Sequence, residues 1–151
     1  MVYARESLAA VLPEVMPLLA AHWAEVAHYK DIPLDVDVEA YCQFEASGAF
    51  RVYTARNGNG VLLGYAAYVV RFNPHYRGSL QAHQDVLFLR PDARGLGGEL
   101  VRYSEETLRA EGVQVITQHV KVATPRTGAL MERLGYEAMD VIYVKRLDRE
   151  A

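Results

Sequence analysis

The fold of this chain is decided by residues 85–100, which read DVLFLRPDARGLGGEL. A short apolar run typical of a strand is followed by a turn containing Gly95, Gly97 and Gly98, and then by the start of an amphipathic helix. The glycines let the backbone pass close to a ligand, and the start of a helix directs unpaired N–H groups and a partial positive charge toward it. These residues therefore predict a site for phosphate groups, and a diphosphate fits it.

Two other phosphate-binding motifs do not match this turn. The loop of the NTPases needs Gly-x4-Gly-Lys-Ser/Thr, and the chain has no Lys-Ser or Lys-Thr pair. A dinucleotide fingerprint needs a third glycine after Gly95-x-Gly97, where the chain has Leu100, and it belongs to the first strand of its fold rather than past mid-chain. A glycine-rich turn that binds nothing is the structural alternative.

The composition is that of one ordinary globular domain spanning residues 1–151. Hydrophobic residues make up 51% of the chain and charged residues 23%, and the formal net charge is −3. Because no basic stripe is present, we expect no nucleic-acid partner. The single cysteine, Cys42, excludes an internal disulfide and fits a reducing compartment, so we expect a cytoplasmic location.

Residues 8–21 form an apolar stretch behind Arg5, a pattern that signal peptides and membrane spans share. Pro13, Glu14 and Pro17 interrupt the stretch and leave apolar pieces too short to cross a bilayer. We therefore expect a buried helix here and no membrane partner.

Hydrophobic periodicity and turn residues predict an alternation of helices and strands. Residues 57–60 read Asn-Gly-Asn-Gly, a strong hairpin signal because Asn-Gly readily adopts positive φ. The order of elements predicts a mixed α/β (α+β) sheet, largely antiparallel with one parallel strand–helix–strand crossover. The expected helices span 12–29, 38–47, 97–111 and 126–134, and the expected strands span 2–6, 50–56, 61–72, 81–89, 113–122 and 136–147.

The order of elements and the turn resemble the GNAT N-acetyltransferase superfamily, in which such a turn holds the diphosphate of acetyl-CoA. The family's turn runs Arg/Gln-x-x-Gly-x-Gly/Ala. If Gly95 and Gly97 take the glycine positions, Asp92 stands at the Arg/Gln position, and Arg94 is free for a phosphate oxygen. In a second alignment Arg94 takes the first position and Glu99 replaces the last glycine.

A second motif in the C-terminal third also resembles the family. There a strand ends at an Asn, and a helix follows that reads roughly Ala-x-x-Leu-Tyr-x-x-x-Gly-Phe. Leu130, Gly135 and Tyr136 fit this pattern. Thr124 replaces the Asn, and Met131 replaces the Tyr that usually protonates the departing thiolate.

A finer resemblance is to small GNAT-like proteins encoded by tailed bacteriophages. The residues that carry it are the strand at 84–88, the pair at 75–76 and the pair at 22–23. It implies no known substrate.

The resemblance implies acetyl-CoA as the cofactor. In the family, two parallel strands, here 85–89 and 115–122, splay apart so that the pantetheine amides pair with free backbone groups. A strand N–H near Leu89 then polarises the thioester carbonyl. The expected cofactor-binding residues are Leu87, Phe88, Leu89, Arg94, Gly95, Leu96, Gly97, Gly98, Thr124 and Arg126.

Acetyl transfer to an amine depends most on a base. At pH 7 an ammonium with a pKa of ~10.4 costs ~4.6 kcal/mol to deprotonate, whereas a thiolate leaving group with a pKa of ~8.5 costs only ~2 kcal/mol. We expect Asp85 as the base and His83, two residues earlier on the same strand face, as the second candidate. Tyr136, or Tyr143, is a stand-in for the missing acid; a surface or core role is the alternative for each of these residues.

The expected first helix offers an acceptor site. His22, Glu25 and Tyr29 share one face at helical spacing, and Trp23 lies beside them. In the GNAT fold this helix and the next one form the acceptor wall, and a carboxylate among aromatic rings suits a cationic amine. Plain packing of the aromatic residues against the sheet is the alternative.

Two further functions remain open. A GNAT-like scaffold that binds acetyl-CoA or a partner protein without catalysis is consistent with Met131 and Thr124. A metal-dependent enzyme would need His and Glu residues to gather, but the spacing His-x-x-Glu-x-x-His from His22 lacks the pair of His residues at i and i+4. We therefore expect no metal, with acetyl-CoA and an amine acceptor as partners and a homodimer left open.

Overall fold

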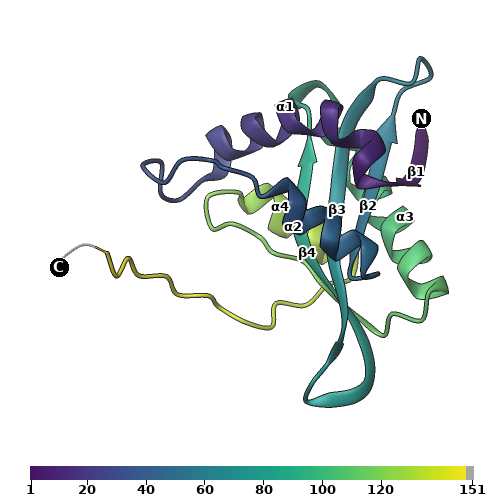
Figure 1. Cartoon of the computed structure of the whole chain (residues 1–151), viewed down its shortest axis with the longest axis vertical. Coiled ribbons are helices and arrows are strands. Elements are labelled where there is room, and N and C mark those ends of the chain that lie inside the picture. The colour runs from purple at the N-terminus through teal and green to yellow at the C-terminus, as the bar shows by residue number, and fades with distance from the viewer. Residues whose placement is uncertain (149–151) are drawn as a thin grey trace.

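The computed structural model describes residues 1–148, and within them the chain forms one mixed sheet with helices on both faces (Figure 1). The sheet has the order β1-β2-β3-β4-β5; β1 to β4 pair antiparallel, and β5 pairs with β4 in parallel. The expected α/β class is confirmed. The strands are β1 (Val2–Glu6), β2 (Phe50–Arg56), β3 (Leu62–Asn73), β4 (Tyr76–Leu89) and β5 (Val115–Thr117), and the helices are α1 (Leu8–Val26), α2 (Val38–Ala46), the short 3-10 helix η1 (Pro91–Leu96), α3 (Gly97–Ala110) and α4 (Pro125–Arg133).

Two apolar clusters cover the two faces of the sheet. Because successive strand residues point to opposite faces, Tyr65 and Ala67 of β3 pack under α1, while Ala66 and Tyr68 pack under α3. We call these the α1 face and the α3 face. The α1 face is closed by Leu8, Val11 and Val15, and the α3 face by Leu100 and Leu108.

The hairpin expected at residues 57–60 is confirmed. The Asn57 side chain accepts the N–H groups of Asn59 (2.9 Å) and Val61 (3.0 Å), and Gly60 has a φ of 80°. These bonds hold the turn between β2 and β3 in the shape that the Asn-Gly pairs favour.

Helix α1 begins and ends earlier than residues 12–29, the range that the sequence predicts. Ser7 accepts the N–H of Ala10 with its side chain (3.3 Å) and caps the helix start. At the other end the carbonyl of Trp23 accepts both the N–H of Ala27 (2.9 Å) and the ammonium of Lys30 (3.2 Å). No helix among residues 1–148 is both long enough and apolar enough to cross a membrane.

The strand expected at 113–122 is paired only at β5. Beyond Thr117 the Gln84 side chain takes the N–H of His119 (2.8 Å), so a side chain replaces the strand backbone as the partner. The expectation of a long strand was wrong because it assumed a backbone partner along all ten residues.

The final strand expected at 136–147 is also wrong. The segment has no regular structure and leaves the sheet, as the yellow end of the ribbon shows in Figure 1. Its side chains at Ile142 and Tyr143 are 77% and 92% exposed. Two causes are visible: β5 offers an edge of three residues, and Arg146 is held by Asp31 (3.1 Å) on the loop after α1.

Candidate functional site

Strands β4 and β5 diverge after a short paired region and open one edge of β4. Parallel pairing ends at His83, and the Gln84 side chain then takes the N–H of His119. Residues 85–89 of β4 therefore have no strand partner on that side within the described part of the chain. We call them the free edge.

Backbone groups of the free edge point into the opening. The Arg90 N–H donates to the carbonyl of Leu63 on β3 (2.8 Å). Because alternate residues of a strand direct their backbone groups to opposite sides, Leu87 and Leu89 direct theirs away from β3 and toward the opening. An extended amide ligand could pair there as a strand would.

A β-bulge at Asp85 changes the course of β4 beside the free edge. The register passes from the pair Ala67–Val86 directly to the pair Tyr68–Gln84, so Asp85 is the extra residue. Bulges bend a strand and redirect the side chain of the extra residue. Here the Asp85 carboxylate is exposed at the rim of the α1 face.

Tyr41 of α2 fixes the Asp85 carboxylate. Its hydroxyl donates to Oδ2 of Asp85 at 2.9 Å. Burial, followed by the negative charge of Asp85, raises the pKa of Tyr41 to about 12. The hydroxyl therefore stays protonated at neutral pH and remains a donor to the carboxylate.

His83 lies on the same face of the sheet as Asp85. Its register partner is Val69, which packs against the cluster of the α1 face. Burial lowers the pKa of His83, and the positive charge of Arg71 and a smaller effect of His119 lower it further. The imidazole is therefore neutral at pH 7 and able to accept a proton.

The turn expected to hold phosphate groups is the helix η1, which leads directly into α3. Neither start has a side-chain cap. Arg90 pairs with Asp92 (3.1 Å), and Arg94 pairs across space with Glu25 of α1 (2.6 Å).

The three glycines of the turn differ in their surroundings. A Cβ at Gly95 would meet nothing within 4 Å, whereas one at Gly97 would lie 3.4 Å from Leu130 and 3.5 Å from Leu89. Gly98 also faces Leu130, at 3.4 Å. Gly97 and Gly98 thus face α4 and β4 at ordinary contact distance, and Gly95 is the one that borders open space.

Helix α4, whose Leu130 faces Gly97 and Gly98, begins with polar residues. Thr124 is its N-cap residue, but its hydroxyl donates to the carbonyl of Lys121 (3.0 Å) and does not cap the helix. Arg126 is exposed in the first turn. Both residues have polar groups that could reach a ligand.

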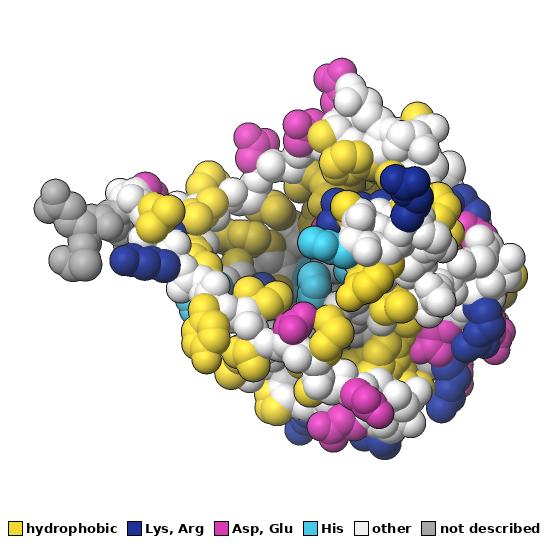
Figure 2. All heavy atoms as spheres, turned by 90° about the horizontal axis from the view of Figure 1, so that it is seen from below, with side chains coloured by type: hydrophobic (Ala, Val, Ile, Leu, Met, Phe, Trp, Pro, Cys, Tyr) yellow, Lys and Arg dark blue, Asp and Glu magenta, His cyan; other side chains and the backbone are white. Residues whose placement is uncertain are grey.

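The acceptor residues expected on the first helix are only partly brought together. The His22 ring packs on Phe88 of the free edge, with ring centroids 5.1 Å apart, and burial lowers its pKa. Tyr29 lies beyond the end of α1, so the helical face that would have joined it to His22 and Glu25 is broken. Figure 2 shows histidine side chains inside a hollow that hydrophobic side chains border.

Three of these acceptor residues already contact a cationic side chain of the chain itself. Glu25 holds Arg94, the Trp23 ring lies 5.4 Å from the ammonium of Lys30, and the Tyr29 ring lies 5.2 Å from the guanidinium of Arg146. A cationic substrate would have to displace these contacts.

Tyr136 is not brought together with Asp85 and His83. Its hydroxyl donates to Glu105 of α3 (2.6 Å) and accepts from Gln118 (3.1 Å), which also donates to Tyr68 on the α3 face. Burial and Glu105 raise its pKa well above the ordinary value. The hydroxyl is thus hydrogen-bonded on the α3 face of the sheet, and its expected role as a proton donor stays a prediction.

Two further expectations concern the position of Met131 and the possibility of a metal site. Met131 is buried, so its position supplies neither a hydroxyl nor a solvent-facing group. Within residues 1–148, no three or more His, Cys, Asp or Glu side chains gather in a way that could hold a metal ion.

The sequence profile of the acetyltransferase (GNAT) family matches residues 15–136. The chain belongs to this family. Membership makes it an acetyltransferase by family, and the matched residues include the part of α1 from residue 15 onward, the free edge, the turn and α4. A comparison with curated proteins gives no match.

Solved structures share this GNAT fold across nearly the whole chain. The BH1408 protein of Bacillus halodurans, as a tetramutant, has a TM-score of 0.76 at 15% identity, covering 97% of this chain and 100% of its own. An aminoglycoside acetyltransferase from an uncultured soil metagenomic sample has a TM-score of 0.75 at 15% identity (97% and 96% covered). A ribosomal-protein-alanine N-acetyltransferase from Brucella melitensis biovar Abortus 2308 has 0.72 at 19% (97% and 100%).

Sequence reasoning missed two residues that shape the site of this GNAT protein. Gln84 is a buried polar residue, but its sequence neighbours are the polar residues His83 and Asp85, so the local sequence did not mark it as buried. Tyr41 gave no signal, because an aromatic residue on a short helix is ordinary core material.

Proposed function

We propose that this GNAT protein transfers the acetyl group of acetyl-CoA to a primary amine of a small molecule or protein. The observation that carries the proposal is the free edge at residues 85–89, which lies between the bulge at Asp85 and the turn at η1. The end of β4 thus offers unpaired backbone groups and an acidic side chain, and the uncapped start of η1 follows directly after it.

The residues around the opening fit acetyl-CoA. Backbone groups at Leu87 and Leu89 would hold the pantetheine amides beside Phe88, and Gly95 leaves room for the diphosphate. Arg94 would bind a phosphate oxygen once it leaves Glu25. Leu96, Gly97 and Gly98 form the backbone of the turn, and Thr124 and Arg126 border it from α4. The cofactor supplies the acetyl group as a thioester.

The proton of the incoming ammonium goes to a group on the α1 face. Asp85 is our first candidate for the base because its carboxylate is exposed and oriented by Tyr41 (2.9 Å). His83 is the second because its lowered pKa keeps the imidazole neutral. A base positioned in this way is typically worth a factor of roughly 10² to 10⁴ in rate.

The acceptor enters past the end of α1, where His22, Trp23, Glu25 and Tyr29 lie. His22 contacts Phe88 and therefore borders the reacting end of the free edge. Two proteins of similar fold carry names that state their acceptors, an aminoglycoside and a ribosomal-protein alanine, and both acceptors are amines. Identities of 15% and 19% do not transfer either acceptor to this chain.

A binding protein without catalysis is the second candidate. The observation that favours it is Met131, which is buried and stands where the resemblance to the family implies a proton-donating Tyr. Because the thiolate needs less help than the ammonium, we rank it below the enzyme.

We also propose that the chain works in the cytoplasm as a homodimer. The extended segment at 138–147 exposes Val141, Ile142 and Tyr143, and it begins beside a groove lined by Val115 and Ile116 of β5. Among residues 1–148 no strand pairs with the outer edge of β5, so the segment of a second copy can add to it as a strand. Pairing would cover both apolar surfaces at once.

The proposal is tested by acetyl-CoA binding and by thiol release with a panel of amines. Calorimetry with acetyl-CoA measures the use of the opening, and amine-dependent release of free CoA separates the enzyme from the scaffold. Binding of acetyl-CoA together with amine-dependent release of CoA supports the enzyme. Binding of acetyl-CoA without CoA release for any amine supports the scaffold. If acetyl-CoA does not bind, both candidate functions are wrong.

A further inference from the structure

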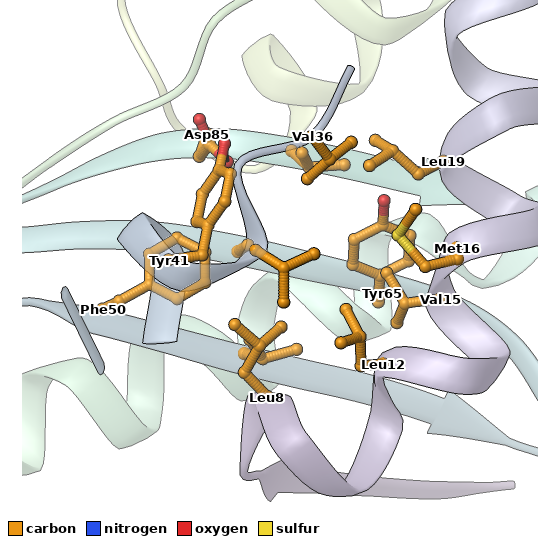
Figure 3. Close-up of a pocket in the computed structure, with 14 residues that line it drawn as sticks. Leu8, Leu12, Val15, Met16, Leu19, Val36, Tyr41, Phe50, Tyr65 and Asp85 are labelled. Carbon is orange, nitrogen blue, oxygen red and sulfur yellow. Dashed lines mark hydrogen bonds between the residues drawn. The ribbon is translucent and has the colours of Figure 1, made fainter. Parts of the chain in front are cut away.

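A second cavity lies under α1 and α2, beside the Asp85 bulge (Figure 3). Its volume is about 50 Å³. Since one water needs roughly 10–15 Å³ on this measure, the cavity holds about four water-sized groups, the size of a short alkyl chain.

The floor and walls of this cavity are apolar. Side chains such as Leu12, Met16 and Phe50 surround it, and Asp85 is the one charged residue among those that line it. Figure 3 shows Tyr41 pointing toward Asp85 on one side and the Leu and Met side chains of α1 on the other. The cavity is therefore charged only at the end where Asp85 lies.

A buried hydroxyl without a partner faces the same space. Tyr65 is 3% exposed, and its hydroxyl has no hydrogen-bond partner in the described structure. A buried hydroxyl left unpaired costs about 1–3 kcal/mol, so such groups are uncommon unless a ligand completes them. Asp85 and Tyr41 both act electrostatically on Tyr65, which places the three polar groups near one another.

We propose that the acceptor is a primary amine with a short apolar carbon chain, bound with the chain in this cavity and the amine beside Asp85 and Tyr65. This inference rests on the proposed function and names its substrate class. The Tyr65 hydroxyl accepts a hydrogen bond from the amine, and the Asp85 carboxylate neutralises and then deprotonates the ammonium.

The contrast with the end of α1 supports this choice. There the acidic and aromatic groups are already occupied by Arg94, Lys30 and Arg146. In the cavity the one carboxylate is paired, within residues 1–148, with a neutral hydroxyl, Tyr41, and with no cation. An uncompensated carboxylate next to an apolar cavity is complementary to an ammonium with an apolar tail.

The first test compares two amines of equal length, butylamine and 2-methoxyethylamine, which differ by an oxygen in place of one methylene. The ether's ammonium is the more acidic of the two, so chemistry alone favours the ether. We expect kcat/KM for butylamine to be at least about tenfold higher, because an apolar wall cannot satisfy the ether oxygen. Equal values, or a preference for the ether or for an aminoglycoside, overturn the inference and leave acetyl transfer intact.

Variants then locate the site. Met16→Trp fills the cavity and should raise the KM for butylamine about tenfold or more, with unchanged acetyl-CoA affinity. Ala20→Trp is the matched control, since Ala20 is exposed on the same helix and does not line the cavity. Tyr65→Phe removes the unpaired hydroxyl, so it should raise the same KM without lowering the melting temperature. A KM unmoved by both Met16→Trp and Tyr65→Phe overturns the inference.

Failure of the proposed function is distinguishable from failure of this inference. If acetyl-CoA binds but no amine is acetylated, there is no turnover to measure. Calorimetry then measures whether butylamine binds to the CoA-loaded protein. Binding that Met16→Trp removes and Ala20→Trp keeps supports the cavity as an amine site. No binding of butylamine overturns it.

Discussion

Arg94 of η1 and Glu25 of α1 form an ion pair, with 2.6 Å between Nη2 and Oε2. The pair joins the residue proposed to bind a phosphate oxygen to one proposed to border the acceptor. Both side chains are about half exposed, at 53% and 41%. If Arg94 binds the phosphate as proposed, acetyl-CoA competes with Glu25 for Arg94 and releases Glu25 when it binds.

Glu25→Gln should tighten acetyl-CoA binding. Exposed ion pairs contribute about 0.2–1 kcal/mol, so removing the competing charge should lower the Kd by up to about fivefold. Calorimetry measures it, and Glu14→Gln is the control, because Glu14 lies on the same helix but pairs with Arg56. Weaker binding in Glu25→Gln would show that the pair positions Arg94 instead of occupying it.

Gly95→Trp should abolish or strongly weaken acetyl-CoA binding while the protein stays folded. A side chain at Gly95 extends into open space at the turn, whereas one at Gly97 would press on Leu130 and Leu89 and disturb the fold as well. Gly78→Trp, also in open space but on the β3–β4 hairpin, is the control. Thermal shift by acetyl-CoA is the measurement; an undiminished shift in Gly95→Trp contradicts the proposed cofactor site.

Asp85→Asn should lower kcat at neutral pH by roughly 10² or more, because Asn keeps the contact with Tyr41 but cannot accept the proton. Met131→Leu should leave kcat nearly unchanged, since it is an apolar exchange at a buried position. Small and equal effects would remove Asp85 from the mechanism.

His83 is tested by the pH profile. Its lowered pKa places the midpoint of its protonation below 6.5, the ordinary value, so a role as base predicts a loss of activity on the acid side of that pH. In His83→Ala this acid limb should disappear together with the activity that depends on it. If the acid limb persists unchanged in His83→Ala, it belongs to the titration of another group.

Truncation after Glu137 should convert a dimer into a monomer. The removed residues include the exposed Val141, Ile142 and Tyr143, which we propose to pair with β5 of a second copy. Light scattering coupled to size exclusion measures the mass. A full-length chain that is already monomeric at micromolar concentration contradicts the dimer.

Local signals predicted much of the fold. The Asn-Gly turn at 57–60 and the glycine at Gly112 after α3 act within a few residues, and the structure bears out the hairpin and the helix they mark. The start of α1 was missed although Ser7 is an ordinary N-cap residue, because Pro13 and Pro17 made the apolar stretch look like a late helix start.

The missed parts depend on distant partners. The length of β5 is set by Gln84 taking a backbone N–H that lies 35 residues away, and the lost final strand depends on that short edge. The bulge at Asp85 and its bond to Tyr41 likewise need the packed sheet. The resemblance to phage-encoded proteins, the absence of a nucleic-acid partner and the cofactor residues stay predictions.

The most direct test of the account is to identify the product of acetyl-CoA and butylamine by mass spectrometry, alongside the CoA released. The account predicts N-butylacetamide in equal amount to free CoA with the wild-type chain, and a loss of both with Asp85→Asn. Release of CoA without the amide, or the same amide yield from Asp85→Asn, would contradict it.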